Sequence, residues 1–282
     1  MSKEELTFEA CNQMVRDFEN VILTPIKEHS GVYYTGVDLG TACVVLAVLD
    51  EQRRPVAGAF RYADVVRDGM VVDYIGAIRI VREMKEELEA KLDTELLYAA
   101  AAIPPGTDAL DSGAIKNVVQ GAGFEITALP DEPTAANAVL NITNGAVVDI
   151  GGGTTGISVL KDGKVVYVAD EPTGGTHFSL VISGAYKMPF GDAEAYKRDP
   201  ANHRELLPVL KPVIEKVSSI ISHHIQGQEV EGIYLVGGTC CLAGIEDIIQ
   251  KKTGIPTYKP KNPMFVTPLG IAQNCTGAAW EP

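Results

Sequence analysis

The stretch AVVDIGGGTTGISVLKDGKVVYVAD, residues 146–170, ends an apolar run on Asp149 and continues with a glycine-rich turn, a β-branched segment, a polar turn and a second β-branched segment. A weaker copy, YTGVDLGTACVVLAVLDEQRRPVAGAF, occupies residues 34–60, with Asp38 in the equivalent place. The two aspartates are 111 residues apart, so the unit repeats once at about the length of a domain. We therefore expect two related halves that face each other and bring both glycine turns to one ligand-binding cleft.

The glycines of the second copy include a match to the dinucleotide motif Gly-x-Gly-x-x-Gly, through Gly151, Gly153 and Gly156. That motif needs a helix directly after it, because the phosphate lies at the helix N-terminus. Here a β-hairpin follows, with its turn at residues 161–163. The pattern argues against an NAD-dependent oxidoreductase, and the missing Gly-x-x-x-x-Gly-Lys motif argues against a P-loop enzyme.

A glycine-rich hairpin turn can still bind phosphate, because glycine adopts positive φ and several N–H groups can then converge on one anion. The alternative is that residues 151–153 form only a tight turn. Two copies, each preceded by an aspartate, favour the phosphate site. Aspartate beside phosphate suits hydrated magnesium, which prefers carboxylate, water and phosphate oxygens.

The segment LPDEPTAANAVL, residues 129–140, places Glu132 before Pro133, a favourable first residue of a helix, and gives that helix a thin, alanine-rich face. One interpretation is an ordinary N-terminal cap. The other is a carboxylate that orients a water molecule beside the second hairpin.

Two later segments also carry candidate residues. In LVGGTCCLAGIEDII, residues 235–249, the double glycine at 237–238 either lets a flat ring or a sugar approach closely or simply turns a strand into a helix. In DAEAYKRDP, residues 192–200, Glu194 and Lys197 share one helical face, where the alternative is a solvated ion pair.

The charge balance argues against nucleic acid and anionic membranes as partners. The 282 residues include 24 Lys and Arg against 37 Asp and Glu, a net charge of -13. The segment MSKEELTFEACNQMVRDFENVILTPIKEH at the amino terminus mixes charges into its apolar positions, unlike a secretory or transit peptide. No apolar run approaches the roughly 18 residues of a membrane helix. We expect a soluble cytoplasmic protein.

The five cysteines predict neither a disulfide framework nor a metal site, because their number is odd and no Cys-x-x-Cys pair occurs. A metal at the vicinal Cys240 and Cys241 is the weaker alternative, since no His or second cysteine pair stands at ligand spacing. We expect small buried thiols in a reducing compartment.

The order of the expected elements indicates an α/β fold with mixed sheets, in which a hairpin opens each half and helices close it. Helical spacing of apolar residues predicts an amphipathic docking helix at the amino terminus, through Phe8, Cys11, Val15, Phe18 and Ile22. Strands are expected at residues 34–38, 43–49, 55–61, 97–103, 124–129, 146–150, 156–160, 164–170 and 232–236. Helices are expected at residues 75–92, 109–122, 133–142, 176–187, 192–198, 205–226 and 241–253.

These motifs, in this order, resemble those of the actin-like ATPase superfamily, which includes DnaK-type chaperones, actin and sugar kinases. GVDLGTA looks like the first phosphate motif, DEPTAA the first interdomain helix, DIGGGTTGIS the second phosphate motif, LVGGTCC the adenosine motif and FVTPLGIA the second connecting helix. The match spans residues 34–275. YADVVRDGMVVDY, PPGTD and EAYKR resemble more closely the ethanolamine utilization protein EutJ family, a short DnaK-like branch associated with bacterial microcompartments.

The resemblance implies ribonuclease H-like duplicated halves with reduced outer subdomains and an added N-terminal helix. The expected boundaries are a helical extension at residues 1–32, a first half at 33–143 completed by 264–282, and a second half at 144–263.

The resemblance also implies the cofactors, ATP or ADP with Mg²⁺, and the residues that hold them. Asp38 and Asp149 would hold magnesium through water. Asp149 and Glu132 would be the catalytic residues, and Glu132 would position the attacking water. The phosphates would contact Gly40, Thr41, Gly151, Gly152, Gly153 and Thr154. The adenosine would be surrounded by Gly175, Glu194, Lys197, Arg198, Gly238, Thr239 and Asn262.

Several residues depart from the family pattern. Gly156 stands where DnaK-type chaperones have a second metal-side aspartate, and Cys241 where their adenine-stacking arginine falls. The insertions that form the two outer subdomains are mostly missing, and no counterpart of the catalytic lysine is identifiable. The resemblance therefore supports nucleotide binding more strongly than fast hydrolysis.

The resemblance implies slow ATP hydrolysis, coupled to closure of the two halves, in a chaperone-like or assembly role in ethanolamine utilization. The alternative is a nucleotide-gated scaffold or filament adaptor with little turnover, which the missing lysine and aspartate counterparts favour. A small-molecule kinase is the weakest hypothesis, because such kinases usually carry larger insertions. The expected partner is a protein client among the pathway's enzymes or shell proteins, met in the cytoplasm or at a microcompartment.

Overall fold

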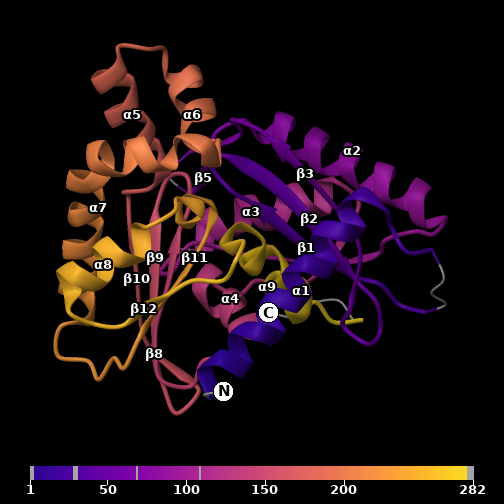
Figure 1. Ribbon diagram of the computed structural model, residues 1–282. Coiled ribbons are helices and arrows are strands. Elements are labelled where there is room, and N and C mark those ends of the chain that lie inside the picture. Colours follow the sequence, from indigo (N-terminus) through magenta and orange to yellow (C-terminus); the bar gives the residue numbers. More distant parts are fainter. Residues whose placement is uncertain (1–2, 28–30, 68, 108, 278–282) are drawn as a thin grey trace. The chain divides into compact units, whose positions relative to one another are not determined.

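The structure is a computed structural model, and it describes residues 3–27, 31–67, 69–107 and 109–277 (Figure 1). The chain divides into two compact units. Unit 1 comprises the described residues of Met1–Asn141 and Phe265–Pro282, and unit 2 comprises Ile142–Met264.

The described part of unit 1 is built on a five-stranded sheet of order β3-β2-β1-β6-β7. Strands β1 (Tyr34–Leu39), β2 (Cys43–Leu49) and β3 (Pro55–Tyr62) are antiparallel. Strands β6 (Tyr98–Ala101) and β7 (Glu125–Ala128) continue the sheet in parallel with β1. A small hairpin of β4 (Val66–Arg67) and β5 (Met70–Val71), which the sequence did not predict, lies outside this sheet.

Helices cover both faces of this sheet. An apolar core joins β1, β2 and β3 to α2 (Tyr74–Leu92) and α3 (Ala109–Gly121). A second cluster joins β6 to α4 (Glu132–Leu140) and α9 (Val266–Asn274), the two helices that the sequence predicted as connecting helices. Alanine in α4 and Gly270 in α9 let these two helices approach until their backbones almost touch.

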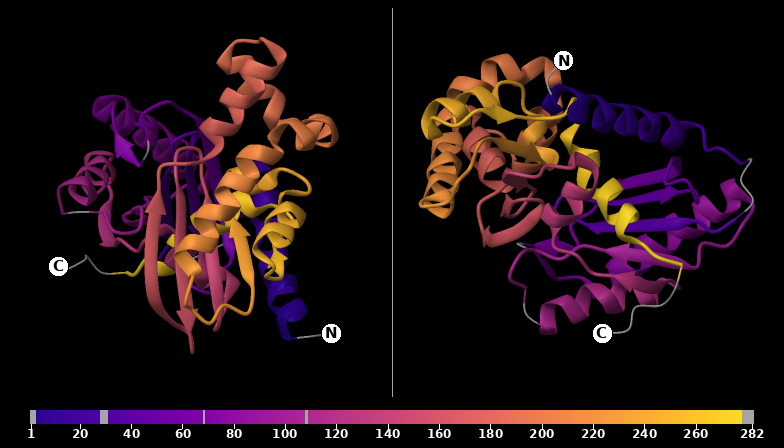
Figure 2. Two further views of the ribbon diagram at one scale, coloured as in Figure 1. Left: turned by 90° about the vertical axis from the view of Figure 1, so that its left-hand side faces the viewer. Right: turned by 90° about the horizontal axis from the view of Figure 1, so that it is seen from below.

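Unit 2 repeats the plan, with a sheet of order β10-β9-β8-β11-β12 in its described residues. Strands β8 (Gly145–Ile150), β9 (Thr155–Lys161) and β10 (Lys164–Glu171) are antiparallel, and β11 (Ile233–Val236) and β12 (Thr257–Tyr258) run parallel to β8. The predicted duplication is therefore confirmed. One core packs α5 (Gly175–Tyr186), α7 (His203–Ile225) and α8 (Ile245–Thr253) on the sheet, and α6 (Phe190–Arg198) packs against α5 (Figure 2).

The predicted helix at residues 241–253 is wrong at its start. A short 3₁₀ turn, Gly238–Cys241, follows β11, and α8 begins only at Ile245. Gly244 has a φ of 84°, which interrupts helical geometry between the two segments. Strand β12 was also missed, because two residues carry no readable alternation.

The amino-terminal docking helix is confirmed as α1 (Lys3–Leu23), which packs against β3. The Phe18 side chain is fully buried, and its ring lies edge-on to Phe265 with centroids 5.3 Å apart. Gly58 of β3 makes room for it, because a Cβ built there would lie 2.3 Å from the ring carbon Cε2 of Phe18.

We expect Gly58→Ala to loosen α1, because a methyl group cannot share that space and overpacking costs about 1–3 kcal/mol. Hydrogen exchange of the α1 amides should become faster than in the wild type. Adding Phe18→Leu should restore part of the protection. Wild-type exchange rates in Gly58→Ala would show that α1 is not held by this contact.

Candidate functional site

The loop between β8 and β9, residues 151–154, is the centre of the candidate site in unit 2. Its ends are joined by a hydrogen bond from the Gly151 N–H to the Thr154 carbonyl, 3.0 Å long. Two of its carbonyls point to the first turn of α5, where the N–H groups of Gly175 and Thr176 donate to Gly151 O and Gly152 O at 2.9 and 2.8 Å. The loop thereby satisfies N–H groups that a helix N-terminus leaves without partners.

Because the loop's carbonyls face α5, backbone N–H donors are left on the opposite edge of the loop. In a trans peptide the N–H points opposite to the preceding C=O, so the N–H groups of Gly152 and Gly153 point away from α5. Neither of these N–H groups donates to any described residue. Two neighbouring backbone donors are a suitable cradle for a phosphate oxygen.

The expectation that these glycines adopt positive φ is wrong. The described residues with positive φ do not include Gly151, Gly152 or Gly153. The donors face outward because α5 holds the loop's carbonyls. Close packing also requires a glycine at residue 174, directly before α5. A Cβ built on Gly174 would lie 2.8 Å from Gly153 C and 2.9 Å from both Gly151 O and Gly152 O.

Four of the residues predicted around an adenosine form one network beside this loop. The Thr239 hydroxyl donates to Gly151 O at 2.7 Å. The Lys197 ammonium donates to Gly175 O and to the Glu194 carboxylate, both at 2.8 Å. The structure thus brings Gly175, Glu194, Lys197 and Thr239 together at the start of α5.

The interpretation of Glu194 and Lys197 as a solvated ion pair is wrong, because their side chains are only 20% and 12% exposed. Burial acts to raise the pKa of Glu194, but the charge and hydrogen bond of Lys197 and the hydroxyl of Ser179 hold it below its usual value. Burial lowers the pKa of Lys197, and Glu194 opposes that shift. The pair fixes α6 against the first turn of α5.

Asp149 is 5% exposed at the end of β8, beside Val236 of β11. A Cβ built on Gly237 would lie 2.2 Å from the Asp149 Oδ1, so the glycine makes room for this carboxylate. Burial and then the charge of Asp149 raise the pKa of the Cys240 thiol. The Cys240 thiol is therefore harder to ionise than an exposed cysteine.

The other predicted adenosine residues lie at the edge of unit 2. Gly238 and Arg198 are exposed, and the Cys241 thiol lies 3.5 Å from the Asn262 Oδ1. His203 was missed by the sequence analysis, although it joins two of these segments. Its Nε2 is 3.1 Å from Lys197 O, and its Nδ1 accepts from the Ala243 N–H at 3.2 Å. A lone histidine at a helix start carries no sequence signal for that role.

The remaining predicted residues lie in unit 1. Asp38 is half-buried in β1, and Gly40 and Thr41 form the turn to β2. Asp131 is the cap of α4, because its carboxylate accepts from the Thr134 N–H at 2.9 Å and from the Thr134 hydroxyl at 2.7 Å. The interpretation of Glu132 as the cap is therefore wrong, and Glu132 lies in the first turn of α4.

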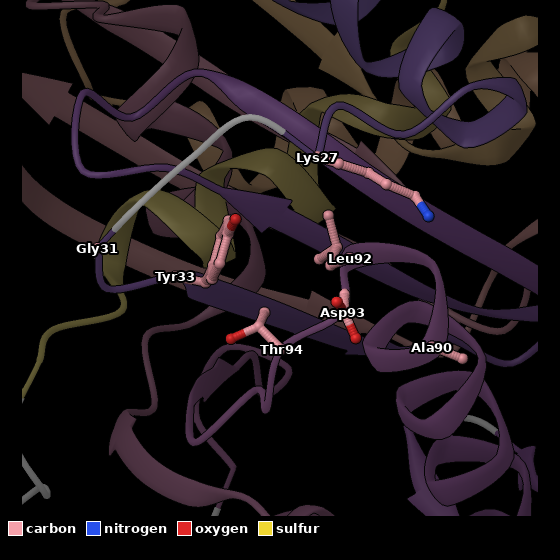
Figure 3. A pocket seen from close by; sticks show the side chains of 7 residues that line it. All are labelled: Lys27, Gly31, Tyr33, Ala90, Leu92, Asp93 and Thr94. Carbon is pink, nitrogen blue, oxygen red and sulfur yellow. The ribbon is translucent and has the colours of Figure 1, made fainter.

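Unit 1 also contains a hollow of about 500 Å³ between the end of α2 and the segment before β1 (Figure 3). Tyr33, Asp93 and Thr94 line it, and the Lys27 side chain extends away from Tyr33. None of the predicted site residues lines this hollow.

The residues present suit a phosphate ligand with water-bound magnesium. The described part of the chain has no cluster of three His, Cys, Asp or Glu side chains that could hold a metal alone. Magnesium usually keeps several waters and binds one or two carboxylates plus phosphate oxygens. Asp149 beside two free backbone donors fits that requirement.

Comparisons with known proteins identify relatives of this chain. A family model described as Type IV pilus assembly protein PilM matches residues 126–264. The ethanolamine utilization protein EutJ of Salmonella typhimurium (strain LT2) is 45% identical over 242 residues, which cover 86% of this chain and 85% of that protein. None of the described helices combines the length and the apolar character that a membrane span requires.

Two crystal structures have folds similar to that of this chain. That of EutJ from Carboxydothermus hydrogenoformans has a TM-score of 0.89 and 47% identity, and covers 95% of this chain and 99% of that chain. That of MreB5 of Spiroplasma citri bound to AMPPNP has a TM-score of 0.70 and 18% identity, and covers 86% of this chain and 95% of that chain. The fold is the actin-like ATPase fold, as the sequence predicts.

Proposed function

Because the chain belongs to the family of the ethanolamine utilization protein EutJ, we propose that it binds ATP with magnesium, hydrolyses it slowly and serves ethanolamine utilization as a chaperone-like or assembly factor. The observation that carries the proposal is the outward-facing pair of N–H groups at Gly152 and Gly153. Oriented backbone donors bind a phosphate group without a lysine.

The chain's own residues have separable tasks in this proposal. The loop of residues 151–154 binds phosphate oxygens, and Asp149 would hold magnesium through water. The 3₁₀ turn at Gly238 and the face of α6 near Lys197 border the adenosine. A second phosphate turn at Asp38, Gly40 and Thr41 of unit 1 stays a prediction. Coupling of turnover to closure of the two halves stays a prediction.

Titration calorimetry tests the binding step. We expect saturable binding of ATP and ADP in the presence of magnesium, and no heat from NADH, because no helix follows the glycines as a dinucleotide site requires. Binding of NADH without binding of ATP would overturn the proposal. A ligand held only by the folded state also raises the melting temperature by mass action.

Slow turnover is expected because the sequence has no identifiable counterpart of the family's catalytic lysine. Phosphoryl transfer depends on neutralising charge at the terminal phosphate, and a missing cation costs on the order of a thousandfold or more. Lys197 is held in place by Glu194 and Gly175 O, which accept two of its three N–H donors. Turnover should fall well below the roughly 1–1000 s⁻¹ of ordinary enzymes.

We expect Glu132→Gln to bind ATP normally and to lose the remaining hydrolysis, because an amide cannot accept the proton of an attacking water. Phosphate release measures the loss, and calorimetry measures binding. Glu125→Gln, at an exposed strand start, is the matched control. Wild-type turnover in Glu132→Gln would remove its catalytic role and favour the alternative function, a nucleotide-gated scaffold or filament adaptor.

The expected partner is a protein client among the pathway's enzymes or shell proteins, met at a bacterial microcompartment or in the cytoplasm. Affinity purification in ATP and in ADP should recover such a client in one nucleotide state only. Equal recovery in both states would argue against nucleotide control of the contact.

A further inference from the structure

Asp170 of β10 is a carboxylate beside the phosphate loop that the sequence analysis did not single out. It pairs with Gly156 of β9, and Gly156 pairs with Asp149 of β8. Directly paired residues in a sheet project from the same face. Asp149 and Asp170 therefore share one face, about 10 Å apart, with a residue that has no side chain between them.

The Asp170 carboxylate holds the loop through one contact. The Thr154 side chain, itself 8% exposed, hydrogen-bonds to it. The other oxygen, Oδ1, is buried and accepts no hydrogen bond from the described residues. The backbone N–H of Glu171 also hydrogen-bonds to this carboxylate. An ionised carboxylate can accept several hydrogen bonds, so one of its two oxygens is left unsatisfied.

The charged groups around Asp170 do not compensate for its burial. Burial raises the pKa of Asp170 to about 6, and the charge of Glu171 adds to that shift, while hydrogen bonds from the Thr154 side chain and the Glu171 backbone N–H oppose it. Glu171 projects from the opposite face of β10, where its Oε1 lies 2.9 Å from His224 Nε2 of α7. Lys216 of α7 donates to Thr173 at 3.2 Å.

The state of Asp170 decides what Thr154 can offer a ligand. A threonine hydroxyl has one proton to donate. While Asp170 is ionised, that proton is held by its carboxylate, and the hydroxyl oxygen presents only lone pairs to a phosphate. A protonated Asp170 donates to the hydroxyl oxygen instead, which frees the Thr154 proton for the phosphate.

We propose that Asp170 is a positioning residue that controls the direction of the Thr154 hydroxyl, so that the loop holds the phosphates of a nucleotide more tightly when Asp170 carries a proton. The inference rests on the proposed function. It adds a residue and a dependence on acidity to the same site.

The test measures ATP affinity by calorimetry from pH 5 to pH 8, at fixed excess magnesium, for the wild type and Asp170→Asn. The asparagine amide donates to Thr154 at every pH, as the protonated acid does. The terminal phosphate of ATP titrates equally in both experiments, so the ratio of the two affinities isolates Asp170. We expect a ratio near one at pH 5 and about tenfold tighter binding by Asp170→Asn at pH 8, as for a hydrogen bond to a charged group.

Two further variants separate positioning from a structural effect. In a Thr154→Val background, Asp170→Asn should leave the affinity unchanged, because the hydroxyl that it acts through is gone. Glu171→Gln should move the pH profile of ATP affinity to lower pH, because it removes a charge that raises the pKa of Asp170. A ratio that stays constant with pH, or an effect of Asp170→Asn that persists without the hydroxyl, would overturn the inference but leave the proposed function standing. Absence of ATP binding at every pH in all proteins would overturn both.

Discussion

Replacing Gly174 with alanine is expected to weaken ATP binding about a hundredfold without unfolding the protein. Gly174 has φ −147° and ψ −159°, extended values that alanine adopts without strain. Its new Cβ would meet three backbone atoms of the phosphate loop, the nearest at 2.8 Å. The loop must move by several tenths of an ångström or more, and misplacement of about 1 Å can cost a site a hundredfold.

Gly184→Ala is the matched control for this substitution. It lies in the same helix, α5, and a Cβ there meets nothing within 4 Å. We expect unchanged ATP affinity and a stability gain of about 0.5–1 kcal/mol, because alanine is the better helix residue. If Gly174→Ala bound ATP as the wild type does, the contact between α5 and the loop would not set the geometry of the donors.

Gly270→Ala should destabilise unit 1 by about 3 kcal/mol or more, the upper end of overpacking effects. A Cβ at Gly270 would lie 1.9 Å from Ala135 O and 2.5 Å from Ala135 C. These are backbone atoms of α4, so no side-chain rotation can relieve the clash. Chemical denaturation, followed by fluorescence and circular dichroism, measures the change in the free energy of unfolding.

Gly113→Ala provides the comparison within unit 1, because it lies in α3 and a Cβ there meets nothing within 4 Å. It should be neutral or slightly stabilising. Equal stability of Gly270→Ala and Gly113→Ala would contradict the close crossing of α4 and α9.

The sequence predicted the architecture well because its signals were strong and repeated. Two Asp-Gly hairpins predicted both sheets, and helical spacing predicted the docking helix α1. The start of α8 was predicted four residues early, because the pattern cannot show that Gly244 leaves helical geometry.

For the candidate site, the sequence predicted which residues take part but not which contacts they make. Sequence motifs named Gly151, Gly175 and Lys197, but the hydrogen bonds that join them depend on tertiary packing. The positive φ expected of the glycines was wrong, since the constraint comes from α5. Asp170 was missed for a physical reason: regular pairing from the hairpin turn at residues 161–164 would place Ala169 opposite Gly156, and only the register shift between Val165 and Tyr167 brings Asp170 there.

The account's central claim is that the N–H groups of Gly152 and Gly153 bind the phosphates of ATP. Amide NMR spectra of the ¹⁵N-labelled protein, recorded with increasing ATP and magnesium, test it most directly. The account predicts that these two amides show the largest shifts and saturate with the calorimetric affinity, while the exposed turn residue Gly163 does not move. Saturable ATP binding that leaves the Gly152 and Gly153 amides unchanged would contradict it.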